Sequence, residues 1–181
     1  MEFDNLDDAY FANHGIKASV TGRYHFNLSH QTGEEYVTQS GYFDLAYNLQ
    51  SYITPGGGRF TIIPQLYGRY VTGIPGYFNL WSIYGSEVPG RHLDDQMPFI
   101  GFGAVEVADD NASVLRVDLR YNFYGNHYLA AMYNVMMDWG VVPLMPYEDE
   151  LKLVEVHGAG LKYSYKSPLG PISLTAHWAN R

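Results

Sequence analysis

The stretch SVLRVDLRYNF, residues 113–123, alternates apolar and polar side chains with a period of two. Successive side chains of a β-strand point to opposite faces, so this stretch predicts a strand with one apolar face and one charged face. The apolar face carries Leu115, Val117, Leu119, Tyr121 and Phe123, and the polar face carries Arg116, Asp118, Arg120 and Asn122. A soluble β-sandwich can use the same alternation with its apolar face turned inward.

Length and repetition favour strands that cross an outer membrane. The same alternation recurs in six further stretches, at residues 16–28, 43–50, 60–69, 128–137, 158–165 and 172–178. Membrane-spanning strands need about 9–11 residues, whereas globular strands have about 5–6. The stretch 128–137 is the weakest case because both of its faces are fairly apolar. The chain is therefore predicted to be all-β.

The connections between these stretches alternate in length. Long connections are predicted at Ser29–Gly41, Thr72–Ala112 and Asp138–Val154, and short ones at Ile53–Gly58, Tyr124–Asn126 and Lys166–Gly170. This order is typical of an antiparallel transmembrane β-barrel with short periplasmic turns and long extracellular loops. We therefore expect residues 1–181 to form one barrel domain of about seven to eight strands, or the C-terminal part of a larger barrel.

Two features lead us to expect a piece of a longer protein. Seven transmembrane strands is an odd number, whereas bacterial single-chain barrels have an even number with both ends periplasmic. The first residues, which include Asp4 and Asp7, show no basic and apolar segments of a signal peptide. At least one closing strand is therefore expected to lie outside this chain.

Composition agrees with this class. The chain has 17 Tyr residues and 16% aromatic residues, as expected of aromatic girdles at the two membrane interfaces. A net charge of −8 without a basic cluster argues against a nucleic-acid partner, and the absence of Cys excludes disulfides. No cofactor or metal site is predicted. The girdle candidates are Tyr70, Trp139, Tyr163, Tyr165 and Trp178.

Three segments carry a resemblance to a known family. The run YGSEVPGRHLDDQMPFI at 84–100, the run SVLRVDLRYNFYGNHYLAAMYN from Ser113, and GAGLKYSYKSPLGPISLTAHWANR at the end resemble the C-terminal barrel of Bacteroidetes patatin-like phospholipases. That barrel is similar to the outer-membrane insertase and translocator superfamily. NLDDAYFANHG, residues 5–15, is similar to a turn between two central strands of that superfamily. The resemblance covers essentially the whole chain and implies one further strand after Arg181.

The hydrolase of that family is not in this chain. Its nucleophile requires a Gly-x-Ser-x-Gly pentad, and its aspartate lies in an Asp-Gly pair; the sequence contains neither. We therefore predict that this chain is not an enzyme, because acyl transfer would lack both nucleophile and base. The resemblance places the hydrolase domain upstream of Met1.

The resemblance also implies a contact inside the barrel. Gly90, Arg91 and His92 resemble the arginine motif of a loop that folds back into the lumen, where the arginine pairs with an acidic residue. Asp118 is the matching acid, whereas the partner position on the next strand holds Asn134. Arg116 or Arg120 could instead be the main partner of Asp118. The predicted lumen face also includes Asn134 and Lys162.

Three functional classes remain open on this reading. The first is a barrel module in the outer membrane of a Gram-negative bacterium that anchors, or helps to export, an upstream hydrolase domain. The second is a free-standing pore, for which the cations Lys17, Arg23, Arg69, Arg116, Arg120 and Lys162 would favour anions. The third is a soluble β-sandwich. The expected partners are outer-membrane lipid and lipopolysaccharide, the upstream domain, and either the remaining strands or another copy of the chain.

Overall fold

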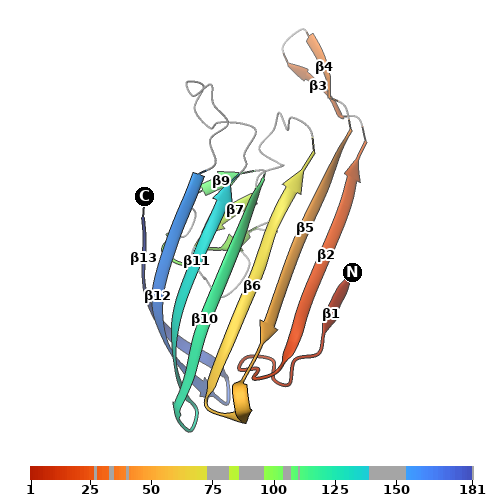
Figure 1. Ribbon diagram of the computed structural model, residues 1–181. Coiled ribbons are helices and arrows are strands. Elements are labelled where there is room, and N and C mark those ends of the chain that lie inside the picture. Colours follow the sequence, from red (N-terminus) through yellow and green to blue (C-terminus); the bar gives the residue numbers. More distant parts are fainter. Residues whose placement is uncertain are drawn as a thin grey trace.

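One antiparallel β-sheet of eight strands makes up most of the molecule (Figure 1). The computed structural model describes residues 1–26, 28–32, 35–39, 41–72, 82–85, 96–103, 107–109, 111–138 and 154–180. The order of the strands in the sheet is their order in the chain, β1-β2-β5-β6-β10-β11-β12-β13. Among these residues, no helix has the length and apolar character needed to cross a bilayer. The predicted all-β class is confirmed.

Seven of the eight strands are long, and they are the seven that the alternation predicted. They are β2 (Gly15–His25), β5 (Tyr42–Tyr52), β6 (Phe60–Val71), β10 (Ala112–Tyr124), β11 (His127–Asp138), β12 (Val154–Ser167) and β13 (Gly170–Ala179). Their lengths range from 10 residues in β13 to 14 in β12, enough to cross a membrane. The eighth strand, β1 (Glu2–Asp4), pairs with β2 and is too short to show a period.

One predicted boundary was wrong. The first long strand was expected to run to Leu28, but β2 ends at His25. Leu28 instead begins a separate hairpin of β3 (Leu28–Thr32) and β4 (Glu35–Gln39), where it pairs with Gln39. The apolar and polar alternation continues from β2 into the hairpin, so it could not mark the point at which the strand ends.

The short turns lie at one rim of the sheet and the long connections at the other (Figure 1). The connection between β5 and β6 holds a 3₁₀ turn, η1 (Pro55–Gly57), in which Gly56 and Gly57 have φ of 64°. The connection between β6 and β10 contains β7 (Ser82–Gly85), β8 (Gln96–Pro98) and β9 (Val107–Asp109), which form a small sheet in the order β8-β7-β9. We call the two ends the short-turn rim and the long-loop rim.

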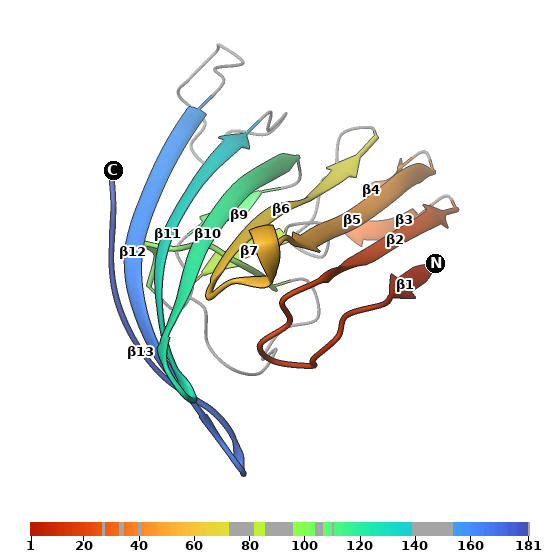
Figure 2. The same cartoon turned by 60° about the horizontal axis from the view of Figure 1, so that its bottom comes forward.

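The eight-stranded sheet is strongly curved and open. Figure 2 shows the strands curling around a concave side, with the connection between β1 and β2 on that side. Within the described residues, β1 pairs with β2 alone and β13 pairs with β12 alone. The sheet therefore has two edge strands and does not close on itself.

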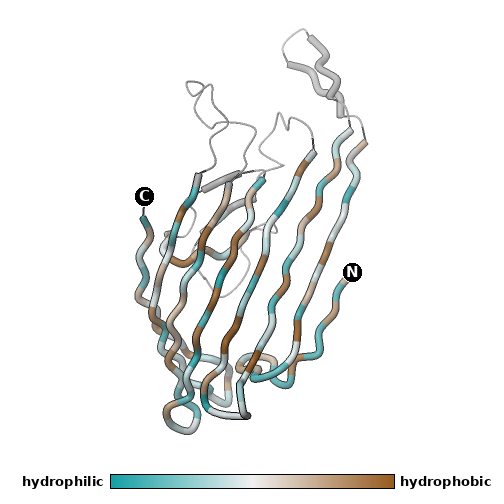
Figure 3. The backbone as a smooth tube through the Cα atoms, in the orientation of Figure 1, coloured by the Kyte–Doolittle hydropathy of each residue, from teal (hydrophilic) through white to brown (hydrophobic). Residues whose placement is uncertain are grey.

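Hydrophilic and hydrophobic residues alternate along the long strands (Figure 3), and the exposures of their side chains show that the two faces differ as the alternation predicted. On β10, the apolar side chains Leu115 and Leu119 are 49% and 40% exposed on the convex face. Arg116 and Arg120, on the concave face, are 3% and 7% exposed. Apolar groups are thus exposed and charged groups buried, the reverse of a soluble sheet.

The apolar core lies on the concave face near the long-loop rim. Its largest cluster joins residues of the sheet to residues of the β6–β10 connection: Tyr67, Tyr84, Phe99, Phe102, Ala112, Val114 and Met136. A second cluster brings Ile100 against Ala130 and Met132 of β11. This packing explains why β11 was the weakest prediction, because its concave face is apolar where the connection covers it.

Candidate functional site

The centre of the concave face is an arginine and aspartate pair on β10. Arg116 donates from Nε to Oδ1 of Asp118 and from Nη2 to Oδ2, both at 2.7 Å. Gln65 of β6 also donates to Oδ2, at 3.4 Å. Both charged groups are buried, so the bidentate geometry offsets the cost of taking them out of water. Arg116 is therefore the observed partner of Asp118. The sequence had left Arg116 open as one alternative to Arg91.

The other residues expected on the lumen face are placed as follows. Asn134 is fully buried on β11, Arg120 is buried on β10, and Lys162 is half-buried on β12. Arg91 lies outside the described residues. On β11, Asn134 lies directly opposite Arg116, and Met132 lies directly opposite Asp118. Asn134 is therefore a diagonal neighbour of Asp118, two residues along the strand.

A segment of the β6–β10 connection, residues 96–103, packs against the concave face, and we call it the loop segment. Ile100 lies so close to β12 that a Cβ added to Gly158 would lie 1.8 Å from the Ile100 carbonyl oxygen. A Cβ on Gly160 would lie 3.0 Å from Ile100 Cγ2. Gly101 has φ of +107°, and its added Cβ would lie 2.6 Å from the Trp178 carbonyl oxygen. The close approach of the loop segment to the sheet therefore depends on glycine at 158 in β12 and at 101 in the loop segment itself, and it leaves little space at Gly160.

Polar contacts fix the loop segment in register. With its amide oriented to satisfy both polar atoms, Asn134 donates to the Gly158 carbonyl at 3.2 Å and accepts from the Ile100 N–H at 3.3 Å. Tyr67 of β6 donates its hydroxyl to the Pro98 carbonyl. Asn134 therefore helps to hold the loop segment against β11 and β12.

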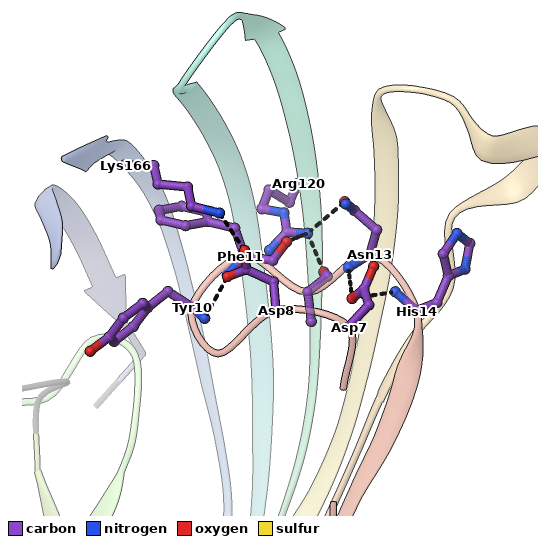
Figure 4. A network of polar contacts seen from close by, with 9 residues as sticks. Asp7, Asp8, Tyr10, Phe11, Asn13, His14, Arg120 and Lys166 are labelled. Carbon is purple, nitrogen blue, oxygen red and sulfur yellow. Dashed lines mark hydrogen bonds and ion pairs between the residues drawn. The ribbon is translucent and has the colours of Figure 1, made fainter. Parts of the chain in front are cut away.

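The connection between β1 and β2, residues 5–14, forms the second structure on the concave face, and we call it the inner turn. Two aspartates order its backbone. Asp7 accepts from the backbone N–H of Asn13 and His14 at 2.8 and 3.1 Å, and Asp8 accepts from those of Tyr10 and Phe11, both at 2.9 Å (Figure 4). Carboxylates that accept backbone N–H groups in this way stabilise turns.

Arg120 holds the inner turn to the middle of the sheet. Its Nη2 donates to the carbonyl oxygens of Phe11, at 3.3 Å, and of Ala12, and to Oδ1 of Asn13 at 3.2 Å. Phe11 is buried and its ring stacks on that of Tyr128, with centroids 4.3 Å apart. The turn therefore reaches from the β1 edge to β10 and β11 across the concave face (Figures 2 and 4).

The far end of the inner turn is bonded to β12 by a salt bridge. Lys166 donates from Nζ to Oδ2 of Asp8. The Lys166 ammonium and the two backbone N–H groups lower the pKa of Asp8 to about 2. Asp8 is therefore ionised at neutral pH, where it can form the salt bridge with Lys166.

Three other cations of the predicted lumen lining, Lys17, Arg23 and Arg69, lie close to carboxylates. Arg69 makes a bidentate pair with Asp44, with both N···O distances 2.8 Å, and Arg23 lies 3.7 Å from the same carboxylate. Lys17 lies 3.3 Å from Asp4. Asp4 and Asp44 thus supply two carboxylates to three of the cations that the pore hypothesis invoked.

The aromatic candidates fall into two groups on the convex face. Tyr70 and Trp178, near the long-loop rim, are 53% and 63% exposed. Tyr163, which is 38% exposed, and the half-buried Tyr165 lie near the short-turn rim, where the rings of both are within 6.0 Å of the His127 ring. Trp139 lies outside the described residues. The two groups lie toward opposite ends of the strands, and their role as girdles at the two membrane interfaces stays a prediction.

Sequence reasoning missed the residues that hold the inner turn. Phe11 and Asp8 lie in a turn, which has no repeating side-chain pattern, and Lys166 lies at the end of β12, just beyond the alternating stretch 158–165. Gly158 and Gly160 did stand on the polar face of their strand, and two glycines facing a lumen are a signal for close approach of another backbone.

Comparison with known proteins supports the architecture. No protein-family model and no curated protein matches the chain. It is similar to the crystal structure of BamA from Haemophilus ducreyi lacking POTRA domains 1–3, with a TM-score of 0.65 and 17% identity. The match covers 99% of this chain and 38% of that one, so the chain spans less than half the length of the structure it resembles. At this identity the likeness shows the fold, which is that of part of the BamA barrel.

Proposed function

We propose that this chain is part of an outer-membrane β-barrel that serves as a structural module. The observation that carries the proposal is the inversion of the sheet, with apolar side chains exposed on the convex face and charged pairs buried on the concave face. The likeness of fold to the BamA barrel supports it. We place this barrel in the outer membrane of a Gram-negative bacterium, with lipid and lipopolysaccharide against its convex face.

Charge substitution on the convex face tests the proposal. Leu119 lies midway along β10 and is exposed, so Leu119→Arg should disfavour insertion by about 2–4 kcal/mol, the cost of a basic residue at the bilayer midplane. Tyr124→Arg, at the exposed end of the same strand, is the matched control, because charges near the interface cost about 0–1 kcal/mol. Recovery in the outer-membrane fraction is the measurement. Equal recovery of both variants would refute a membrane-facing β10.

We further propose that the module anchors, or helps to export, a patatin-like lipid hydrolase domain located upstream. The family resemblance of the sequence supports this, whereas the fold comparison does not address it. The coding sequence upstream of Met1 tests the proposal directly. A Gly-x-Ser-x-Gly pentad and an Asp-Gly pair encoded in frame are the expected result.

The edges of the sheet require partners. Unpaired backbone groups cost several kcal/mol each in lipid, so β1, the uncovered length of β2 and β13 must pair in a membrane. Strands outside this chain are the occupants we propose, since the chain matches 38% of the BamA chain. A second copy of the chain is the alternative, and cross-linking between cysteines introduced at Thr175 of β13 and at Thr21, on the uncovered length of β2, would distinguish them.

The pore alternative is disfavoured by what fills the concave face. The loop segment and the inner turn both pack against the strands that would line a channel. Lys17, Arg69 and Arg116 each pair with a different aspartate, and Arg23 shares Asp44 with Arg69, so three carboxylates offset most of the charge of these four cations. An anchoring barrel does not need an open lumen.

We retain a contact between Arg91 and Asp118 as a proposal. The Asp118 carboxylate accepts three described hydrogen bonds, which leaves room for another donor because a carboxylate has about four acceptor sites. Arg91→Ala and Asp118→Ala should each increase proteolysis between residues 84 and 99, with the double variant no worse than either single variant. Additive effects would show that Arg91 does not contact Asp118, whose partners would then be Arg116 and Gln65 of the described residues.

A further inference from the structure

Arg120 differs from the paired arginines of the concave face in having no carboxylate partner. Arg69 and Arg116 each form a bidentate pair with an aspartate, whereas no carboxylate lies within ion-pair distance of Arg120 in the described part of the chain. Arg120 is 7% exposed, so its charge is almost fully removed from water. A buried arginine normally needs a counter-charge to offset that loss.

The hydrogen bonds of Arg120 use one of its three nitrogens. All four bonds, to Phe11, Ala12, Asn13 and Thr61, leave from Nη2. An arginine carries five N–H donors, so those on Nε and Nη1 have no acceptor among the described residues. The guanidinium therefore keeps donor capacity on the sides that the inner turn does not occupy.

A cavity lies beside this guanidinium. It has a volume of about 220 Å³, is open to solvent on one side, and is lined by the inner turn, by Pro98 of the loop segment and by the sheet. Ala130 contributes to its floor, and in register it lies between Arg120 on β10 and Lys162 on β12. The small side chain of Ala130 leaves space between the two cations. Other lining groups are Tyr10, Tyr52, Pro98, Tyr128 and Ser164.

We propose that this cavity binds a small oxoanion of the phosphate class, with Arg120 as the principal donor and Lys162 and Ser164 completing the lining. Guanidinium groups bind phosphate through charge-assisted hydrogen bonds, which strengthen where water is excluded. The Asp118 carboxylate in the same cavity is already compensated by Arg116, so its repulsion of an anion is reduced. This site goes beyond the proposed barrel function and does not depend on it.

The competing explanation is that aromatic rings alone stabilise Arg120. Its Cζ lies 5.8 Å from the Phe11 ring centroid, 5.9 Å from that of Tyr52 and 5.5 Å from that of Tyr128. Rings at these distances attract a cation without any anion. The two explanations differ in whether phosphate binds.

Calorimetric titration of the detergent-solubilised protein with inorganic phosphate, against chloride at equal ionic strength, tests the proposal. We expect binding of phosphate that is weakened about tenfold or more in Arg120→Gln, the effect of losing one charge-assisted hydrogen bond. Ala130→Leu should abolish binding while leaving Arg120 and the inner turn in place, because it fills the cavity. Lys17→Gln, which removes an exposed cation paired with Asp4, is the control and should bind as the unmodified protein does.

Three results would overturn the site. Absence of phosphate binding to the unmodified protein would mean that the aromatic rings alone stabilise the Arg120 charge. Undiminished binding in Ala130→Leu would place the anion elsewhere. An equal loss in Lys17→Gln and Arg120→Gln would show a general charge effect. Sulfate and glycerol phosphate, titrated in the same way, then distinguish a free oxoanion from a phosphorylated headgroup.

Discussion

The loop segment and the inner turn pack against the same concave face, but different forces hold them. The loop segment is held by close packing: Ile100 lies against two glycines of β12, and its neighbours Phe99 and Phe102 are almost completely buried. The inner turn is held by charge: Asp8 bonds to Lys166, and Arg120 bonds to two of its carbonyl groups. Close packing is insensitive to salt and pH but sensitive to added volume. Ionic contacts are weakened by salt and by protonation of their carboxylates.

Adding volume to β12 should have the largest effect, and it should affect the loop segment alone. Gly158→Val places a side chain where the Ile100 carbonyl now lies, so we expect a loss of about 3 kcal/mol or more in stability. Denaturant unfolding in detergent measures it. Ala159→Val, on the opposite face of the strand, is the control. A similar small loss in both variants would mean that the loop segment does not pack against Gly158.

Removing the guanidinium of Arg120 should release the inner turn and spare the loop segment. Arg120→Gln loses charge-assisted hydrogen bonds to Phe11, Ala12 and Asn13, worth about 1.5–3 kcal/mol. Proteolysis within residues 5–14 should increase. Arg59→Gln, an exposed arginine near the same rim, should leave cleavage unchanged. Cleavage within residues 96–103 that rises equally would show that the two structures are not independent.

The Asn134 side chain accepts a hydrogen bond from the Ile100 N–H and so helps to fix the position of Ile100. Asn134→Leu leaves the Ile100 N–H without an acceptor, at a cost of about 1–3 kcal/mol. Hydrogen exchange at the Ile100 amide should accelerate, while exchange at Phe11 and Tyr10 should not change. Asn134→Asp retains an acceptor and should protect the amide. Loss of protection in both variants would assign the effect to packing instead.

The smallest effect should come from the salt bridge between Asp8 and Lys166. Asp8→Asn should cost below about 1 kcal/mol, because both side chains are partly exposed. Folding lowers the Asp8 pKa from 3.8 to about 2, so its stabilisation is fully present above pH 3.8 and is lost as the pH falls through 2. Acid should therefore loosen the inner turn in this range, and Asp8→Asn should remove that dependence. Persistence of the transition in Asp8→Asn would assign it to another group.

The sequence predicted the long strands and their faces because each strand repeats a period of two over ten residues or more. It also placed Arg116, Asp118 and Arg120 on one face, since that placement follows from the alternation. It could not pair Asp118 with Arg116 in preference to Arg120, because both are two residues away on the same face. Nor could it dock Phe11 on Tyr128, since those residues are 117 positions apart in the printed sequence and no period links them.

Single-channel conductance of the intact protein in a planar bilayer tests the central claim, that structures from both rims occupy the lumen. The unmodified protein should show no steady open-pore current, because the loop segment and the inner turn cover the strands that would line the channel. Gly158→Val combined with Arg120→Gln should conduct, since it displaces both. A steady, large conductance in the unmodified protein, unchanged in the double variant, would contradict the account.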